Sequence, residues 1–250
     1  MSRVRRIAPP AILLALVILA WQGIASTSLF DNYTLASPTE VIRAFRQDHS
    51  LLLDEAGVTT VEILLGLAAS IVLGFGGAIA MHLVRPLRDA AYPLFVASQA
   101  VPFLVLAPIL VVAFDYGLAP KVALIALICF FPIAVNTLDG LRSVDPSLIK
   151  LMQSFGASRL TRLWKAELPA SLPFIFSGLK LAATVSVIGA VFAEFSGAEG
   201  GLGRLVLLAN NQLQTPRLYA GTVLLMLMSI ALFAIVSILE RLAVPWKGNS

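Results

Sequence analysis

The sequence predicts an all-α membrane protein with about six transmembrane helices. Of its 250 residues, 58% are hydrophobic and 13% are charged, whereas about 25% of the residues in a soluble domain are charged. The mean hydropathy is +0.90. Several apolar runs reach the roughly 20 residues that a helix needs to cross a bilayer, and they are too long and too rich in Leu, Ala and Val for barrel strands. The predicted spans are about 10–28, 58–84, 92–114, 121–140, 172–195 and 218–243.

The positions of lysine and arginine predict a multi-pass protein of the plasma (inner) membrane with both termini in the cytoplasm. Cytoplasmic loops of membrane proteins carry an excess of these residues. In this orientation Lys180 lies within the fifth span, twelve of the 18 lysines and arginines lie inside, and five lie outside: Arg43, Arg46, Lys121, Arg204 and Arg217. The sequence pI of about 9.5 therefore reflects topology. Nucleic-acid binding is not expected, because the basic residues are spread over separate loops.

The first predicted span is followed by a polar segment on the outer side of the membrane. The basic residues 3–6 precede the apolar run, which is either a retained span or a secretory signal peptide cleaved near Ala25. Ser37-Pro38-Thr39-Glu40 is typical of a helix start, and Val41, Ile42, Ala44 and Phe45 form an apolar stripe. We expect a short helix along the outer surface; a docking surface for an outside partner is the alternative.

The second span has a pattern that favours close helix packing, whereas the third span is interrupted by prolines. Small residues recur at four-residue spacing in the second span, where they permit close helix packing, either within the chain or between two copies: Gly66, Ser70, Gly74 and Ala78. Three prolines interrupt the third span: Pro93, Pro102 and Pro108. Proline kinks helices, and Ser98 and Gln99 lie just before the second of them. This span is predicted either to line a substrate path or to be kinked for structural reasons.

The remaining spans contain few polar groups. The fourth carries Asn136, and the fifth carries Lys180 and Glu194. We expect Lys180 to extend its ammonium group towards the inner boundary. Glu194 lies near the outer end, where an exposed or capping role competes with a role in transport. The glycine-rich loop that follows leads into a short apolar run, Arg204 to Ala209, which we expect to form a re-entrant or interfacial helix.

The sequence lacks the common motifs of nucleotide-binding and catalytic sites. It has no Gly-Lys dipeptide and hence no Walker motif, no His-Glu-x-x-His and no Gly-x-Ser-x-Gly. Cys129 is the single cysteine. No pair of intramembrane acids at helical spacing suggests a proton relay. We therefore expect no catalytic, cofactor-binding or metal-binding residues in this chain, and its energy source must come from a partner.

Residues 142–173, here called the basic segment, combine positive charge with two amphipathic helices. Asp145-Pro146 is a typical helix start, and Gly156 is expected to end that helix after Phe155 in a left-handed conformation. Ser158 can cap a second helix that runs to Glu167 and ends at Leu168-Pro169. Its basic residues share one face: Arg159, Arg162 and Lys165. An interfacial helix pair attracted to anionic lipid is one interpretation.

The order of residues in the basic segment resembles the cytoplasmic loop of binding-protein-dependent ABC importer permeases. That loop has Glu-Ala-Ala, three residues, a glycine, and a Leu-Pro after about eleven more. Gly156-Ala157, Leu168-Pro169 and Pro173 match it, whereas Lys150-Leu151-Met152 occupy the Glu-Ala-Ala positions. Further patches are similar to the nitrate/sulfonate/taurine subfamily, which includes thiamin-pyrimidine and riboflavin uptake systems: Ala107-Pro108, Phe131-Pro132-Ile133, Asn136-Thr137, Gly140-Leu141-Arg142, Val144-Asp145-Pro146, Ala193-Glu194 and Gly201-Leu202-Gly203.

The resemblance implies the transmembrane domain of a type I ABC importer. It implies a permease homodimer around a central path, an extracytoplasmic substrate-binding protein, and a cytoplasmic ABC ATPase subunit that holds ATP and Mg²⁺. The chain then divides into 1–57, a core permease domain 58–243 and a tail 244–250. Expected path residues are Gln99, Pro102, Asn136 and Glu194. Expected ATPase-coupling residues are Lys150, Leu151, Met152, Ser154, Phe155, Gly156, Ala157, Ser158, Arg159, Arg162, Leu168 and Pro169.

Two other functions compete with this expectation. An ATP-independent secondary transporter or channel would leave the basic segment unexplained and would need an ion-coupling site. An intramembrane enzyme would need a nucleophile or a metal site. We expect a small organic solute, and both a thiamin-precursor pyrimidine and a sulfonate such as taurine remain open.

Overall fold

Every regular element in the described parts of the chain is a helix. The computed structural model describes residues 3–27, 34–98 and 102–246. Its helices are α1 (Arg3–Ala25), α2 (Pro38–Gln47), α3 (His49–Leu83), α4 (Arg85–Ser98), α5 (Phe103–Phe114), α6 (Leu118–Arg142), α7 (Pro146–Ser154), α8 (Arg159–Arg162), the π-helical segment η1 (Leu163–Glu167), α9 (Leu168–Phe195), α10 (Leu202–Asn211) and α11 (Thr215–Ala243).

Four of the described helices are long and apolar enough to cross a membrane: His49–Leu83, Leu118–Arg142, Arg159–Phe195 and Thr215–Ala243. They correspond to the predicted second, fourth, fifth and sixth spans. Two shorter apolar helices, Ile12–Ala25 and Phe103–Phe114, lie within the predicted first and third spans. The transmembrane helical class is therefore confirmed.

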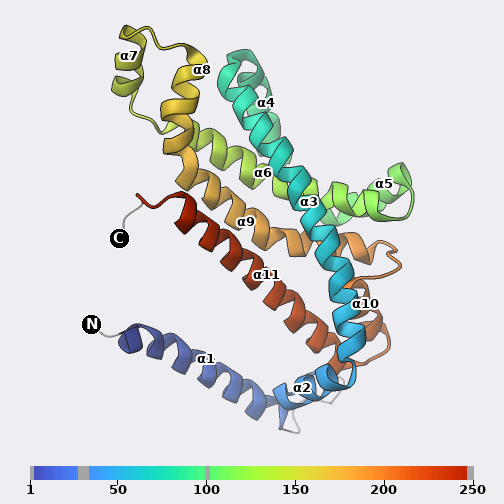
Figure 1. Cartoon of the computed structure of the whole chain (residues 1–250). Coiled ribbons are helices and arrows are strands. Elements are labelled where there is room, and N and C mark those ends of the chain that lie inside the picture. Colours follow the sequence, from blue (N-terminus) through green and yellow to red (C-terminus); the bar gives the residue numbers. More distant parts are fainter. Residues whose placement is uncertain (1–2, 28–33, 99–101, 247–250) are drawn as a thin grey trace.

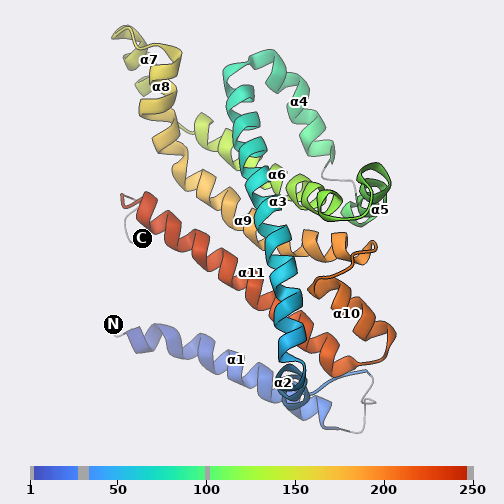
Figure 2. The same cartoon turned by 45° about the vertical axis from the view of Figure 1, so that its right-hand side comes forward.

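The predicted third span, 92–114, is not a single helix. Helix α4 ends at Ser98 and α5 begins at Phe103, directly after Pro102. Pro102 has an extended backbone, with φ −67° and ψ 108°, and proline has no N–H to donate to a preceding turn. In contrast, Pro93 and Pro108 are accommodated inside α4 and α5. Figures 1 and 2 show α4 turning back beside α3.

Helix α6 forms the centre of the core, between α3 and α9. The small residues of α3 face α6 and are all buried: Gly66, Ser70, Gly74 and Ala78. A methyl group at Gly74 would lie 2.9 Å from Ile133 Cγ2, and one at Gly178 of α9 would lie 2.6 Å from the Pro132 carbonyl oxygen. These contacts confirm packing within the chain as the role of the small-residue face, which leaves it unavailable to a second copy.

Helix α2 confirms the short helix that the Ser-Pro-Thr-Glu start predicts, and its position on the outer surface stays a prediction. The Ser37 backbone N–H donates to Glu40 Oε2 at 2.8 Å, and the Glu40 N–H donates to Ser37 Oγ at 3.4 Å, which completes a capping box. The hydrogen bonds from Ser37 lower the pKa of the Glu40 carboxyl. Val41 and Ala44 are buried, whereas Ile42 and Phe45 are exposed, so only half of the predicted apolar stripe packs against the chain.

The second helix of the basic segment does not end at Leu168-Pro169, contrary to the prediction. Helices α8, η1 and α9 form one continuous rod from Arg159 to Phe195. In η1 the Leu168 N–H donates to the Leu163 carbonyl, five residues back. A π-helical turn is wider than an α-helical turn, and it therefore makes room for the ring of Pro169.

Lys180 is held by an ion pair inside the bundle. Its Nζ contacts Glu240 Oε2 on α11. Both side chains are largely buried. Glu240 lies in the last turn of α11, towards the predicted inner end, so the expected extension of Lys180 in that direction stays a prediction. No local pattern in the sequence indicates this pair, because the two residues lie on different spans.

Candidate functional site

The basic segment begins with the predicted helix–glycine–helix unit. The Asp145 carboxylate accepts a hydrogen bond from the Ser147 N–H at 2.8 Å, which lowers the pKa of the Asp145 carboxyl. Helix α7 ends near Gly156, which has φ +75°, a conformation that favours glycine. Ser158 Oγ then accepts from the Thr161 N–H at 3.1 Å and caps α8. These local signals were all readable in the sequence.

Helix α7 presents an uncovered apolar surface. No residue of α7 is buried, and the Leu151 and Phe155 side chains are 54% and 83% exposed. Figure 1 shows α7 and α8 at one end of the molecule, beside the α3–α4 turn. Burying such apolar side chains is favourable, so this end of the molecule is suited to a protein contact.

The structure separates the twelve predicted coupling residues into two groups. Lys150, Leu151, Ser154, Phe155, Gly156 and Ser158 are exposed around α7, with Met152 and Ala157 half-buried beside them. The others lie on the long rod: Arg159 is exposed, Arg162 is half-buried, Leu168 is buried in the core and Pro169 is exposed. Leu168 is thus placed to support the segment from within.

The basic face of α8 contacts the α3–α4 turn. Arg159 Nη2 donates to the His82 carbonyl oxygen at 3.0 Å. His82 Nε2 lies 2.8 Å from Glu167 Oε2, so the ring of His82 joins α3 to η1. The sequence analysis did not single out His82 or Glu167 as partners, because no local pattern links residues so far apart in the chain.

The four predicted path residues are not brought together as a group. Gln99 lies outside the described residues. Pro102 is exposed at the start of α5. Asn136 is half-buried, and its Nδ2 donates to the Pro132 carbonyl oxygen at 2.8 Å, next to the proline in α6. The transport role of these residues stays a prediction.

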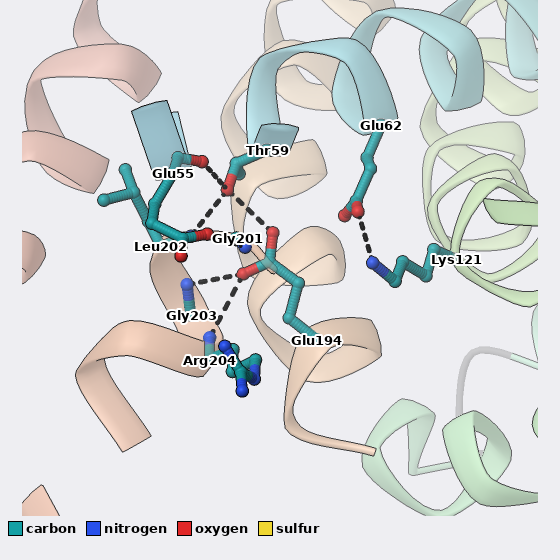
Figure 3. A network of polar contacts seen from close by, with 9 residues as sticks. All are labelled: Glu55, Thr59, Glu62, Lys121, Glu194, Gly201, Leu202, Gly203 and Arg204. Carbon is teal, nitrogen blue, oxygen red and sulfur yellow. Dashed lines mark hydrogen bonds and ion pairs between the residues drawn. The ribbon is translucent and has the colours of Figure 1, made fainter. Parts of the chain in front are cut away.

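Glu194, the fourth of them, organises the loop between α9 and α10. Its side chain is enclosed, with the residue 1% exposed. One carboxylate oxygen accepts from Thr59 Oγ1 at 2.7 Å, and the other accepts from the N–H groups of Gly203 at 2.5 Å and Arg204 at 3.3 Å (Figure 3). A buried carboxylate on α9 therefore caps the N-terminus of α10, as one of the predicted alternatives states.

Helix α3 supplies the other half of this cap. Thr59 Oγ1 accepts from the Leu202 N–H at 2.8 Å, and the Glu55 carboxylate accepts from the Gly201 N–H. Gly201 has φ +113°, and a methyl group there would overlap the Glu194 carboxylate. The Gly-Leu-Gly sequence at 201–203 is thus explained by close contact with Glu194.

A second buried carboxylate lies beside the first. Glu62 of α3 is 1% exposed and its Oε1 pairs with Lys121 Nζ at 2.5 Å. Glu62 Oε2 has no hydrogen-bond partner among the described residues, and Figure 3 draws contacts from Glu62 to Lys121 but none to Glu194. The sequence analysis found no intramembrane acid pair because it considered spacing along one helix, whereas these two carboxylates lie on α3 and α9. Glu62 and Lys121 also line a cavity of about 500 Å³.

Comparison with known proteins decides the family. A family model described as "Binding-protein-dependent transport system inner membrane component" matches residues 66–247. The chain belongs to this family. It is a permease subunit of a binding-protein-dependent ABC importer, and this membership favours ATP-driven import over an ATP-independent transporter or channel.

Several curated relatives of the permease match nearly its whole length. A probable ABC transporter permease protein of Haemophilus influenzae is 35% identical over 91% of this chain and 93% of its own. The formylaminopyrimidine transport permease protein ThiX of Halalkalibacterium halodurans is 34% identical over 99% of both chains. The taurine transport system permease protein TauC of Escherichia coli is 31% identical over 94% of this chain and 88% of its own. These relatives confirm the predicted resemblance to the nitrate/sulfonate/taurine subfamily.

Solved structures confirm the type I importer fold of the permease. Its structure is similar to a chain of the MetNI methionine ABC transporter in an inward-facing conformation, with a TM-score of 0.70 and 18% identity over 79% of this chain and 98% of that chain. A chain of an amino acid ABC transporter gives a TM-score of 0.62 and 15% identity over 79% and 96%. Membership in this family implies an ATPase and a substrate-binding protein as partners.

Proposed function

We propose that the basic segment of the permease docks onto the ATPase subunit and transmits its movement to the membrane helices. The exposed apolar side chains of α7 carry this proposal: Leu148, Leu151 and Phe155. They lie at the end of the bundle where the rod 159–195 begins, so a partner that holds α7 also holds the start of a spanning helix. ATP and Mg²⁺ bind to that partner, and the permease itself supplies no catalytic residue.

The orientation follows from the charge distribution. With α7 on the cytoplasmic side, both termini are cytoplasmic, and α2, α10 and the Glu194 network face the binding protein. Two copies of the permease form the central path, surrounded by membrane lipid. The segments that carry Pro102 and Asn136 contribute to its lining.

The transported solute is a small organic molecule. The relatives transport formylaminopyrimidine, riboflavin and taurine, as their names state. A thermal-shift screen of the cognate binding protein against such compounds tests this part of the proposal. Stabilisation by an inorganic anion alone would contradict it.

Removing the apolar surface of α7 tests the docking. We expect Leu151→Ala with Phe155→Ala to reduce ATPase retention on the purified permease about tenfold or more, since exposed aromatic anchors dominate interface energies, and to abolish ATP-driven uptake in proteoliposomes. Phe45→Ala on α2 is the matched control, because it removes an exposed phenylalanine from the opposite end. ATPase retention and uptake at the wild-type level in the double variant would refute the docking.

A further inference from the structure

A basic cavity of about 660 Å³ lies behind the proposed docking helix. Its walls are the α3–α4 turn, the C-terminal end of α6, and α7 with the start of the rod 159–195. Five arginines line it: Arg85, Arg88, Arg142, Arg159 and Arg162. Guanidinium groups present planar sets of donors that match phosphate and carboxylate oxygens.

The arginine charges in this cavity are poorly compensated. Of the described residues that line it, Glu167 alone is acidic, and its carboxylate is already engaged by His82 Nε2 at 2.8 Å. Arg88 pairs with Asp89 at 2.9 Å. Neither Arg85 nor Arg142 forms an ion pair with another residue in the described ranges. Several like charges thus share one cavity without their counter-ions.

One of the cavity donors is also buried without a partner. Arg162 Nε is inaccessible to solvent and has no hydrogen-bond acceptor. Leaving a buried donor of a charged group unsatisfied is costly, and buried polar groups in proteins nearly always have partners. Arg162 also lines the cavity, and an anion there would neutralise its guanidinium charge and those of the surrounding arginines.

The position of the cavity identifies where such an anion comes from. Helix α3 ends at Leu83 and α6 ends at Arg142, so two predicted spans end at the walls of the cavity. The ends of spanning helices lie at the level of the lipid headgroups, and basic pockets between them on the cytoplasmic side suit anionic headgroups.

We propose that this cavity binds the phosphate group of an anionic phospholipid of the cytoplasmic leaflet. The proposal rests on the orientation given under the proposed function. Ile149 and Gln153 of α7 also line the cavity, so a bound headgroup contacts α7, the rod and the α3–α4 turn together. The lipid thereby fixes α7 relative to the bundle, and coupling depends on the anionic lipid content of the membrane.

Lipid binding to the delipidated permease–ATPase complex tests the proposal. Native mass spectrometry would measure the affinity for phosphatidylglycerol, with phosphatidylcholine as the uncharged reference. We expect Arg85→Gln with Arg142→Gln to weaken phosphatidylglycerol binding about tenfold, since each basic residue near the surface contributes favourably. Arg43→Gln with Arg46→Gln on α2 is the matched control, because it removes two exposed arginines from the opposite end, and we expect it to leave this affinity unchanged.

Arg162→Lys adds a test of geometry, because it keeps the charge and removes the planar guanidinium group that matches phosphate oxygens. We expect it to weaken phosphatidylglycerol binding while the thermal unfolding midpoint of the complex stays within a few degrees. Equal affinities for phosphatidylglycerol in wild type, cavity variant and α2 control would overturn the site.

Two further measurements distinguish the lipid from a soluble phosphate and from the ATPase contact. Inorganic phosphate and glycerol 3-phosphate at millimolar concentration are expected not to displace the lipid; displacement would overturn the lipid as occupant in favour of a soluble phosphate. ATPase retention is measured on the same samples. Loss of ATPase with unchanged lipid binding would overturn the proposal and assign the arginines to the ATPase contact, whereas loss of lipid binding with ATPase retained supports the lipid site independently of the docking.

Discussion

At the scale of single residues, Glu194 shows how one side chain positions a loop. Its carboxylate accepts three hydrogen bonds from α3 and α10 while it is enclosed by protein. Thr59 and Gly203 are buried and Arg204 is half-buried, so the Gly203 N–H in particular cannot turn to water when the carboxylate is lost. The glycine-rich loop between α9 and α10 therefore depends on a residue of the fifth span.

Glu194→Ala is expected to lower the free energy of unfolding by about 2–4 kcal/mol, because it removes the acceptor of the buried Gly203 N–H and of the half-buried Arg204 N–H. Thermal unfolding of the purified permease would measure this. Glu194→Gln keeps one acceptor oxygen and is expected to cost less, and Glu199→Ala removes an exposed carboxylate nearby as a control. An unchanged midpoint in Glu194→Ala would show that the loop is held in another way.

Glu40 gives a pH-dependent contribution to α2. Its pKa is lowered from the ordinary glutamate value of 4.5 by the capping box, so the carboxylate stabilises the folded helix. This stabilisation is complete above pH 4.5 and is lost as the pH falls through the lowered pKa. The protection factors of the α2 amides, which are exchange rates corrected for the intrinsic rate at each pH, are therefore expected to fall more below pH 4.5 in the wild type than in Glu40→Gln, which cannot titrate. Identical acid responses in both proteins would contradict this.

At the scale of elements, the sequence predicted where helices begin better than where they end. Side-chain caps at Ser37, Asp145 and Ser158 act over three or four residues, so their geometry follows from local sequence. Whether a proline ends a helix depends on its surroundings. Pro102 separates α4 from α5, whereas a π-helical turn accommodates Pro169 within a continuous helix. The sequence analysis treated both as interruptions, and only the second interpretation was wrong.

The packing of α3 on α6 yields a matched pair of glycine substitutions. A methyl group at Gly66 would overlap the side chain of Ile125, whereas one at Gly57 in the same helix meets nothing within 4 Å. We expect Gly66→Ala to destabilise the permease by about 1–3 kcal/mol through overpacking, and Gly57→Ala to stabilise it by about 0.5–1 kcal/mol through reduced backbone entropy. Thermal midpoints that shift equally in both variants would contradict this packing.

At the scale of the whole molecule, polar side-chain contacts link helices that are distant in sequence. Glu62 pairs with Lys121 and Lys180 with Glu240, and His82 contacts Glu167. The sequence supplied the transmembrane helical class and the family, because hydropathy and motif spacing are readable along one chain, whereas the orientation stays a prediction. The sequence could not supply these pairs, or the enclosure of Glu194, because they depend on which helix faces meet.

The Lys180–Glu240 pair predicts non-additive effects on stability. Lys180→Met alone is expected to cost about 1–3 kcal/mol, because it removes the cation from a largely buried carboxylate, and Glu240→Leu alone is expected to cost a similar amount. The double variant should be less destabilised than the sum, since replacing a buried ion pair by apolar residues is often neutral. Unfolding of the four proteins in a double-mutant cycle measures the coupling, and strictly additive costs would show that the pair contributes none.

The unbroken rod from Arg159 to Phe195 has a mechanical consequence. At a rise of 1.5 Å per residue, its 37 residues correspond to about 55 Å of helix. One continuous helix therefore joins the α7 end of the permease to the loop that Glu194 holds. We expect a displacement at Arg159 to reach that loop through hydrogen-bonded helix and not through a flexible connection.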